Sequence, residues 1–225
     1  MSATTLAHTR STARSLGTSV PALAGILSAA AFLVGTAVLN VPLKASDSEL
    51  ERWWSSDSHQ VEALASMVSF TLAGLLFVVF LAHLRTRLLA AEGGAGTLTT
   101  IVFSAGLLFV AALFVAATAR GVISHAVKSP SGSQPLPSVD LLRYLPQISY
   151  VALGFCGLLA AALAMAVTSV LAFRKRAFGR VIAWGGILCA AGVVGANALL
   201  LGALAIPAVL LWIVATSVGL ARGVR

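Results

Sequence analysis

Six long apolar runs, separated by short polar segments, make up most of this chain. They cover residues 20–43, 61–84, 98–119, 148–173, 181–201 and 205–221. Each run approaches the roughly 20 residues that a helix needs to cross a hydrocarbon core of about 30 Å. No run alternates apolar and polar residues as barrel strands do, so helices must satisfy the backbone hydrogen bonds in lipid. The pattern predicts an all-α fold, a polytopic bundle of six transmembrane helices that forms one domain over residues 19–225.

The last two runs are predicted to be separate helices because a single one would be too long. Val181–Leu220 contains no charged residue and no histidine. At about 1.5 Å per residue this segment would form a helix of roughly 60 Å, twice the thickness of the hydrocarbon core. Proline is tolerated in the first turn of a helix but not in its middle. We therefore place the break at Gly202–Pro207.

The first 18 residues differ from the six runs, since they are rich in Ser and Thr and show no apolar periodicity. We predict that residues 1–18 form a flexible cytoplasmic tail. The run that follows, Val20–Leu43, is longer than the roughly 7–15 apolar residues of a signal-peptide core. We interpret it as the first span of the protein rather than as a cleaved segment.

The distribution of basic residues predicts the orientation, because cytoplasmic loops carry an excess of Lys and Arg. With the N-terminus inside the cell, ten of the fifteen Lys and Arg residues lie on the cytoplasmic side and six of the seven acidic residues lie outside. The strongest cytoplasmic anchor is Arg174–Arg180, between the fourth and fifth runs. Both termini are therefore predicted to be cytoplasmic, which agrees with an even number of spans because that places both ends on one side.

The composition excludes a soluble fold, since 59% of the residues are apolar and only 10% are charged, against about a quarter charged in soluble domains. The net charge of +8 is spread over short loops instead of one helix face, so we expect lipid headgroups and not nucleic acid as the counterions. Cys156 and Cys189 lie in separate apolar runs, and their spacing indicates neither a disulfide framework nor a metal site.

Acidic residues and histidines gather on the predicted outer side. Asp57, His59 and Glu62 begin the second run, and His125 follows the third. Imidazole and carboxylate groups bind divalent metals, so a metal site is one interpretation. The interpretation that we prefer is that these residues are solvated and that Asp57 or Ser58 caps the helix beginning near His59. We therefore expect no metal and no cofactor.

Glu62 and Arg120 are a second candidate pair, because both are predicted at the outer ends of neighbouring spans. An ionisable group at that depth needs a partner. The alternative is that Arg120 reaches the headgroups while Glu62 stays in water. Two amides on other spans are predicted at a similar depth, and they either bond across helices or complete a shallow pocket that opens outward. The candidate outer polar cluster consists of Asn40, Glu62, Ser66, Arg120 and Asn197.

The order of spans and loops is familiar. The acidic segment Ser46–Trp54, then Asp57, then the span Ser69–Leu84 running into Arg85–Leu88, resembles a group of small integral membrane proteins of actinobacteria that have no assigned function. The last run, Ile206–Ser217, is similar to their last span. The resemblance covers most of the chain as a succession of spans and loops, without a catalytic signature. It implies a six-span protein of the plasma membrane.

The function expected from these observations is non-enzymatic: a structural, regulatory or partner-binding component of the membrane, in contact with lipid and with other membrane proteins. Little charge is predicted in mid-membrane, where ion pumps and proton-coupled carriers place their acids and histidines. The alternative is a transporter of a small solute or lipid with an outward-facing polar pocket. An intramembrane hydrolase ranks last, with Glu62 as general base for a metal-bound water beside His59 and His125.

Overall fold

The computed structural model of the chain describes residues 3–129, 134–175 and 178–222, and within these residues every regular element is helical. In chain order the elements are α1 (Ala3–Val38), α2 (Asp47–Ser55), α3 (Asp57–Glu92), α4 (Thr97–Lys128), α5 (Val139–Val151), the π-helix η1 (Ala152–Gly157), α6 (Leu158–Lys175), α7 (Arg180–Ala198), the 3₁₀-helix η2 (Gly202–Ala205) and α8 (Ile206–Arg222). The all-α class predicted from the sequence is confirmed for this part of the chain.

Five helical segments are long and apolar enough to cross a membrane: Asp57–Glu92, Thr97–Lys128, Val139–Arg174, Arg180–Ala198 and Gly202–Arg222. A sixth apolar segment, Ala22–Val38 within α1, is shorter. The chain therefore has the helical architecture of a multi-pass membrane protein. The crossing by residues 20–43, and with it the total of six, stays a prediction.

Three spans are longer than their apolar runs indicated. The second run was expected over residues 61–84, but α3 covers Asp57–Glu92. The third run was expected to end at Ala119, but α4 continues through Arg120 to Lys128. The fourth was expected to begin at Ile148, but the helix begins at Val139 and holds Pro146 inside it. At Arg120 the helix continues because oxygen atoms of three neighbouring helices accept hydrogen bonds from the guanidinium. The predicted break at Gly202–Pro207 is confirmed, since α8 begins at Ile206 with the proline in its first turn.

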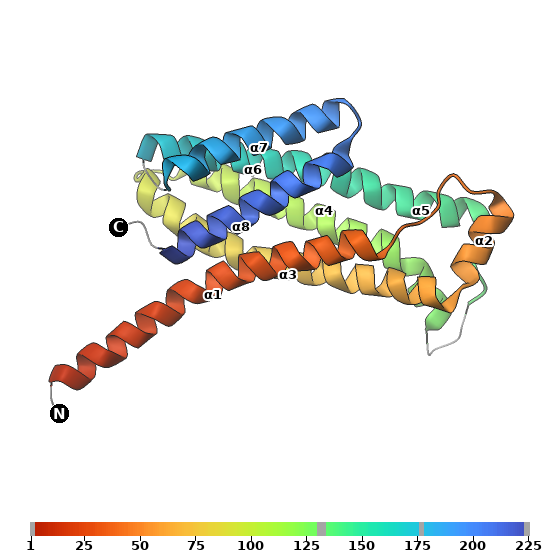
Figure 1. The fold of residues 1–225 in the computed structure, drawn as a ribbon, viewed down its shortest axis with the longest axis horizontal. Helices are drawn as coiled ribbons and strands as arrows, with labels where there is room; N and C mark the ends of the chain where they lie inside the picture. The colour runs from red at the N-terminus through yellow and green to blue at the C-terminus, as the bar shows by residue number, and fades with distance from the viewer. Residues whose placement is uncertain (1–2, 130–133, 176–177, 223–225) are drawn as a thin grey trace.

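The long helices run side by side along the bundle (Figure 1), and their contacts follow a closed order. In this order α1 packs along α3 and α8, α3 along α4, α4 along α6, and α6 along α7, which pairs with α8. The centre is aromatic: Phe32, Phe70, Phe77 and Phe109 are fully or almost fully buried and pack edge-on or tilted, with ring centroids 5.2–5.9 Å apart. Such pairs stabilise the fold beyond their apolar area alone.

Both chain ends lie at the same end of the bundle, and α2 lies at the opposite end, which we call the α2 end (Figure 1). The first turns of α1 project past the other helices there. The flexible tail predicted for residues 1–18 lies partly outside the described residues, and from Ala3 onward the backbone is helical. Its flexibility stays a prediction.

A small apolar cap covers the α2 end, where α2 packs on α3 and α5. Leu50 and Trp54 of α2 are completely buried, as is Leu142 of α5. Arg143 holds the linker between α1 and α2 by donating hydrogen bonds to the carbonyl oxygens of Leu43 and Ala45 and to the Asp47 carboxylate. The acidic segment of the sequence is therefore a docked helix.

Candidate ligand-binding site

Arg120 is the one arginine or lysine buried below a tenth among the residues whose side chains are described, with 3% of its surface exposed. Its Nε donates a hydrogen bond to Ser149 Oγ over 3.0 Å. Its Nη1 donates to the carbonyl oxygen of Gly35 over 3.0 Å and to Ser66 Oγ over 3.2 Å. These partners lie on α5, α1 and α3, so one guanidinium of α4 joins four helices.

No carboxylate in the described part of the chain lies within 4.0 Å of this charge. Among the described residues, the ion pairs are Lys128 with Asp57 and Arg143 with Asp47, both partly or largely exposed. Two aromatic rings accompany the guanidinium instead, with Arg120 Cζ lying 4.9 Å from the ring centroid of Phe70 and 5.1 Å from that of Tyr150. Carbonyl and hydroxyl dipoles and ring faces all attract a cation, and they make its burial tolerable without an acid.

The local sequence explains how these groups converge. Gly35 lets α1 approach α3 closely, because a Cβ atom at this position would lie 2.7 Å from the ring of Phe70. The close approach brings the carbonyl oxygen of Gly35 within 2.7 Å of Ser66 Oγ, which donates a hydrogen bond to it. Ser66 is completely buried. The small residue and the hydroxyl thus build an acceptor for Arg120 at the contact between the two helices.

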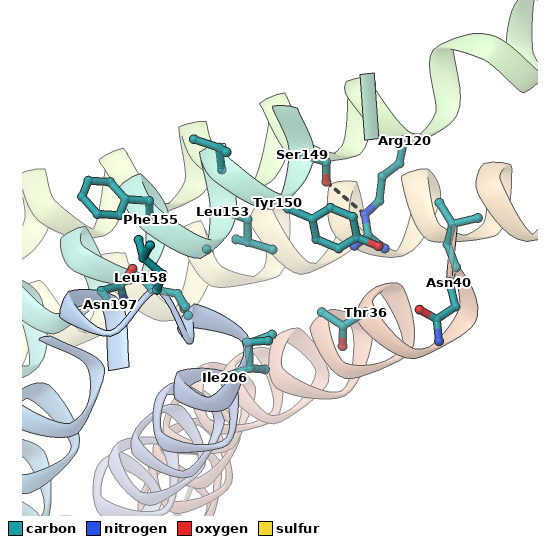
Figure 2. A pocket seen from close by; sticks show the side chains of 16 residues that line it. Thr36, Asn40, Arg120, Ser149, Tyr150, Leu153, Phe155, Leu158, Asn197 and Ile206 are labelled. Carbon is teal, nitrogen blue, oxygen red and sulfur yellow. Dashed lines mark hydrogen bonds between the residues drawn. The ribbon is translucent and has the colours of Figure 1, made fainter. Parts of the chain in front are cut away.

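A cavity of about 560 Å³ opens beside Arg120, between the end of α1, the α5–η1 junction and the start of α8. Figure 2 shows Arg120 and Ser149 on one side of it, with the Tyr150 ring beside the guanidinium, Thr36 and Asn40 reaching in from α1 and its extension, and Asn197 beside Phe155 and Leu158. The rest of the lining is mostly apolar. Its polar members are Thr36, Asn40, Arg120, Ser149, Tyr150 and Asn197.

The π-helical turn η1 forms one wall of the cavity. A π-helix widens the backbone by one residue and is found frequently at functional sites. Within it Gly154 lies next to Gly202 of η2, where an added Cβ atom would come within 2.8 Å of the Gly154 carbonyl oxygen. A Cβ atom on Gly154 itself would meet nothing within 4 Å. The backbone of Gly154 is therefore closely packed against η2, whereas the space that a side chain at Gly154 would enter is open.

Three of the five residues in the predicted polar cluster, Asn40, Arg120 and Asn197, line this cavity. Ser66 contacts Arg120 from behind but is not part of the lining. The Nδ2 of Asn197 donates to the Val193 carbonyl oxygen in its own helix over 3.0 Å, so in the described residues this amide forms no bond across helices.

The predicted Glu62–Arg120 pair is not formed between these two described residues. Arg120 donates to hydroxyl and carbonyl oxygens, and Glu62 is partly exposed one helical turn before Ser66, outside the cavity lining. Opposite charge suggested the wrong partner. Ser149 and Tyr150 were missed as site residues, although a Ser-Tyr pair early in an apolar span was a usable signal. The role of the Gly35 carbonyl could not be predicted, because every residue has a backbone carbonyl.

Two of the four residues considered as metal ligands, His59 and Asp57, have other contacts. His59 stacks on Trp53 with ring centroids 4.2 Å apart, and its Nδ1 lies 2.9 Å from the Trp53 carbonyl oxygen. Asp57 pairs with Lys128. The described residues contain no group of three His, Cys, Asp or Glu side chains placed to hold a metal. The cap of α3 is Ser56, one residue before the predicted Asp57 or Ser58.

The one chemically distinctive feature on these helices is therefore a buried, acid-free arginine beside a mostly apolar cavity. A scan against protein-family models, a search of curated proteins and a search of solved structures found no match to this chain.

Proposed function

We propose that this protein is a non-enzymatic, six-span component of the plasma membrane that binds an amphiphilic molecule in the cavity beside Arg120. The observation that carries the proposal is the combination of an apolar lining with one buried cation at its edge. Ligand sites are mostly apolar clefts with a few polar groups that fix orientation. The size of the cavity, about 560 Å³, lies within the range of roughly 300–1,000 Å³ typical of such sites.

The proposed topology has both termini in the cytoplasm. It is supported by the excess of Arg and Lys in the loops at the end of the bundle where the chain ends lie, in agreement with the positive-inside rule. Under this topology the α2 end faces outward. The cavity then lies toward the outer leaflet.

The surroundings of the cavity favour a ligand that comes from the lipid. Its lining includes Val151 and Phe155, which are about half exposed or more, and Leu200 at the α7–α8 turn, which is 85% exposed. Leu200 has a positive φ of 58°, a conformation uncommon for residues with a Cβ atom, and it turns the chain there. In a membrane these side chains contact acyl chains, so an apolar tail can enter without crossing water.

A binding role without catalysis is supported by the lining. Its titratable members are Arg120 and Tyr150, and it includes no carboxylate and no histidine. Ser149 accepts a hydrogen bond from Arg120 and has no base beside it in the lining. General-base or nucleophilic catalysis requires such a group within hydrogen-bond reach.

The test uses a pair of matched glycine substitutions. Gly154→Leu adds a bulky side chain to a residue that lines the cavity, and Gly192→Leu, on α7, is the control. A Cβ atom meets nothing within 4 Å at either position. Each protein is extracted in a mild uncharged detergent and its retained lipids are counted by mass spectrometry. We expect wild type and Gly192→Leu to retain an amphiphile that Gly154→Leu loses. Equal retention in all three would refute the proposed site.

Transport of a lipid or small solute is the second candidate. The π-helical turn beside the cavity favours it, because interrupted helices line the binding sites of many transporters. Against it, the packed rings of Phe32, Phe70 and Phe109 fill the centre of the bundle. A vesicle assay of lipid movement separates the two functions, since a binding protein leaves the rate unchanged.

A further inference from the structure

The hydrogen bonds of Arg120 leave part of its guanidinium unused. Of the five N–H groups, Nε supplies one to Ser149 and Nη1 supplies two, to Gly35 and Ser66. The two N–H groups of Nη2 have no partner among the described residues. Nη2 is not fully enclosed by protein atoms. It therefore borders open space, and the open space beside Arg120 is the cavity.

This unused donor belongs to a charge that has little access to water, since Arg120 is 3% exposed and has no carboxylate within 4.0 Å in the described part of the chain. Arginine forms its strongest hydrogen bonds with carboxylate and phosphate oxygens. A low dielectric strengthens such a bond. The site is therefore most complementary to an anion.

Two further polar groups of the lining are available to the other oxygens of an anionic headgroup. Asn40 lines the cavity and its side-chain amide has no partner among the described residues. The Tyr150 hydroxyl group, on a ring 5.1 Å from Arg120 Cζ, has none there either. Away from Arg120 the lining continues mainly as Leu153, Phe155, Leu158 and Ile206, which suits an acyl chain. The one amide there, on Asn197, bonds the Val193 carbonyl oxygen of its own helix.

We propose that the ligand is an anionic amphiphile: its oxyanion, a phosphate or a carboxylate, accepts hydrogen bonds from Nη2 of Arg120, and its acyl chain lies along η1 and the start of α8. This inference rests on the proposed function and adds the charge of the ligand to it. It also gives the buried arginine a role beyond joining helices.

The test compares headgroups on the wild-type protein, so that it needs no variant that might fail to fold. The purified full chain in uncharged detergent is titrated with phosphatidylglycerol, oleate, phosphatidylcholine or inorganic phosphate, and its thermal unfolding is followed. We expect phosphatidylglycerol, oleate or both to raise the midpoint, and phosphatidylcholine and free phosphate to leave it unchanged. An equal shift with phosphatidylcholine, a shift with free phosphate alone, or no shift with any probe overturns the proposal.

Variants then locate the effect. Arg120→Gln removes the charge and is expected to weaken binding of the stabilising anion about tenfold or more. Gly154→Leu is expected to abolish the shift, and Gly192→Leu to keep it. If amphiphiles of every charge stabilise the protein and Gly154→Leu blocks them all, the proposed function stands and the anionic ligand is wrong. If Gly154→Leu blocks none of them, the proposed function fails as well.

Discussion

Ser66 Oγ donates a hydrogen bond to the carbonyl oxygen of Gly35 over 2.7 Å, and Arg120 donates to both of these atoms through a single nitrogen. The contact between α1 and α3 thus supplies two oxygens to a cation on α4. The Gly35 carbonyl therefore accepts one hydrogen bond from α3 and one from α4.

Removing the Ser66 hydroxyl group should destabilise the bundle. Ser66→Ala leaves Arg120 with one bond fewer at a completely buried position, and we expect a loss of about 1–2 kcal/mol in the free energy of unfolding. Thr118→Ala is the control, because that hydroxyl bonds only the Phe114 carbonyl in its own helix. Unfolding in detergent, followed by circular dichroism, measures both. Similar losses in the two variants would contradict the structural role of Ser66.

Neutralising Glu62 should have little effect. Its carboxylate makes no hydrogen bond or ion pair with a described residue, and Arg120 bonds elsewhere. We expect Glu62→Gln to change the free energy of unfolding by no more than about 0.5 kcal/mol, as for an ordinary surface substitution. A loss above about 1 kcal/mol, measured in the same detergent, would support the Glu62–Arg120 ion pair that the sequence suggested.

Replacing Arg120 by lysine should be costly although the charge is kept. A lysine ammonium has no planar fork, so it cannot reach Ser149, Gly35 and Ser66 together. We expect Arg120→Lys to cost about 2–3 kcal/mol, measured by the same unfolding assay. Arg87→Lys, at an exposed position on α3, is the control and should be neutral. If the two lysine variants are equally stable, the three bonds contribute nothing to folding.

Acid should weaken the start of α2. The Glu49 carboxylate accepts hydrogen bonds from Ser46 Oγ and from the Ser46 amide, over 2.8 and 3.0 Å, and these bonds lower the pKa of Glu49 below its ordinary value of 4.5. A carboxyl group whose pKa is lowered by folding stabilises the folded state above its unfolded pKa. This contribution is lost as the pH falls below 4.5 and through the folded pKa.

The stability of Glu49→Gln relative to wild type should therefore converge toward zero difference as the pH is lowered through this range. Thermal unfolding from neutral pH to acid provides the measurement. Glu51→Gln, an exposed carboxylate on the same helix, leaves the cap bonds intact and is the control. A difference for Glu49→Gln that stays constant with pH would show that the cap does not act through its charge.

The orientation can be tested with a reporter that is active only outside the cytoplasm. Fused after Arg180, at the start of α7, the reporter should stay inactive because this loop carries the strongest basic anchor. Fused after Gln134, between α4 and α5, it should be active. The reverse pattern would invert the topology and move the α2 end to the cytoplasm.

The sequence was sufficient for the helical class and for the break before Pro207, because apolar length and proline chemistry are local properties. It was insufficient at Arg120. Counting a charge as the end of a span assumes that only water or an acid can satisfy it, whereas here the partners are a backbone carbonyl, two hydroxyl groups and two rings. Such partners come together only through helix packing, so residue type alone led to Glu62.

The cavity was predictable only in part, for a similar reason. Asn40 and Asn197 stand out in apolar runs, and both line it. The π-helical turn at Ala152–Gly157 contains two glycines, but glycine is frequent in transmembrane helices and does not mark such a turn. Its position depends on how η1 packs against α4 and η2.

The exposed apolar side chains of Val151, Phe155 and Leu200 have a consequence for selectivity. A ligand that enters past them diffuses in two dimensions within one leaflet. The occupancy of the cavity then follows the mole fraction of the ligand in the bilayer rather than its aqueous concentration. The tail passes from one hydrocarbon environment to another and gains little free energy on the way. Discrimination among competing lipids consequently falls to the few atoms around the guanidinium.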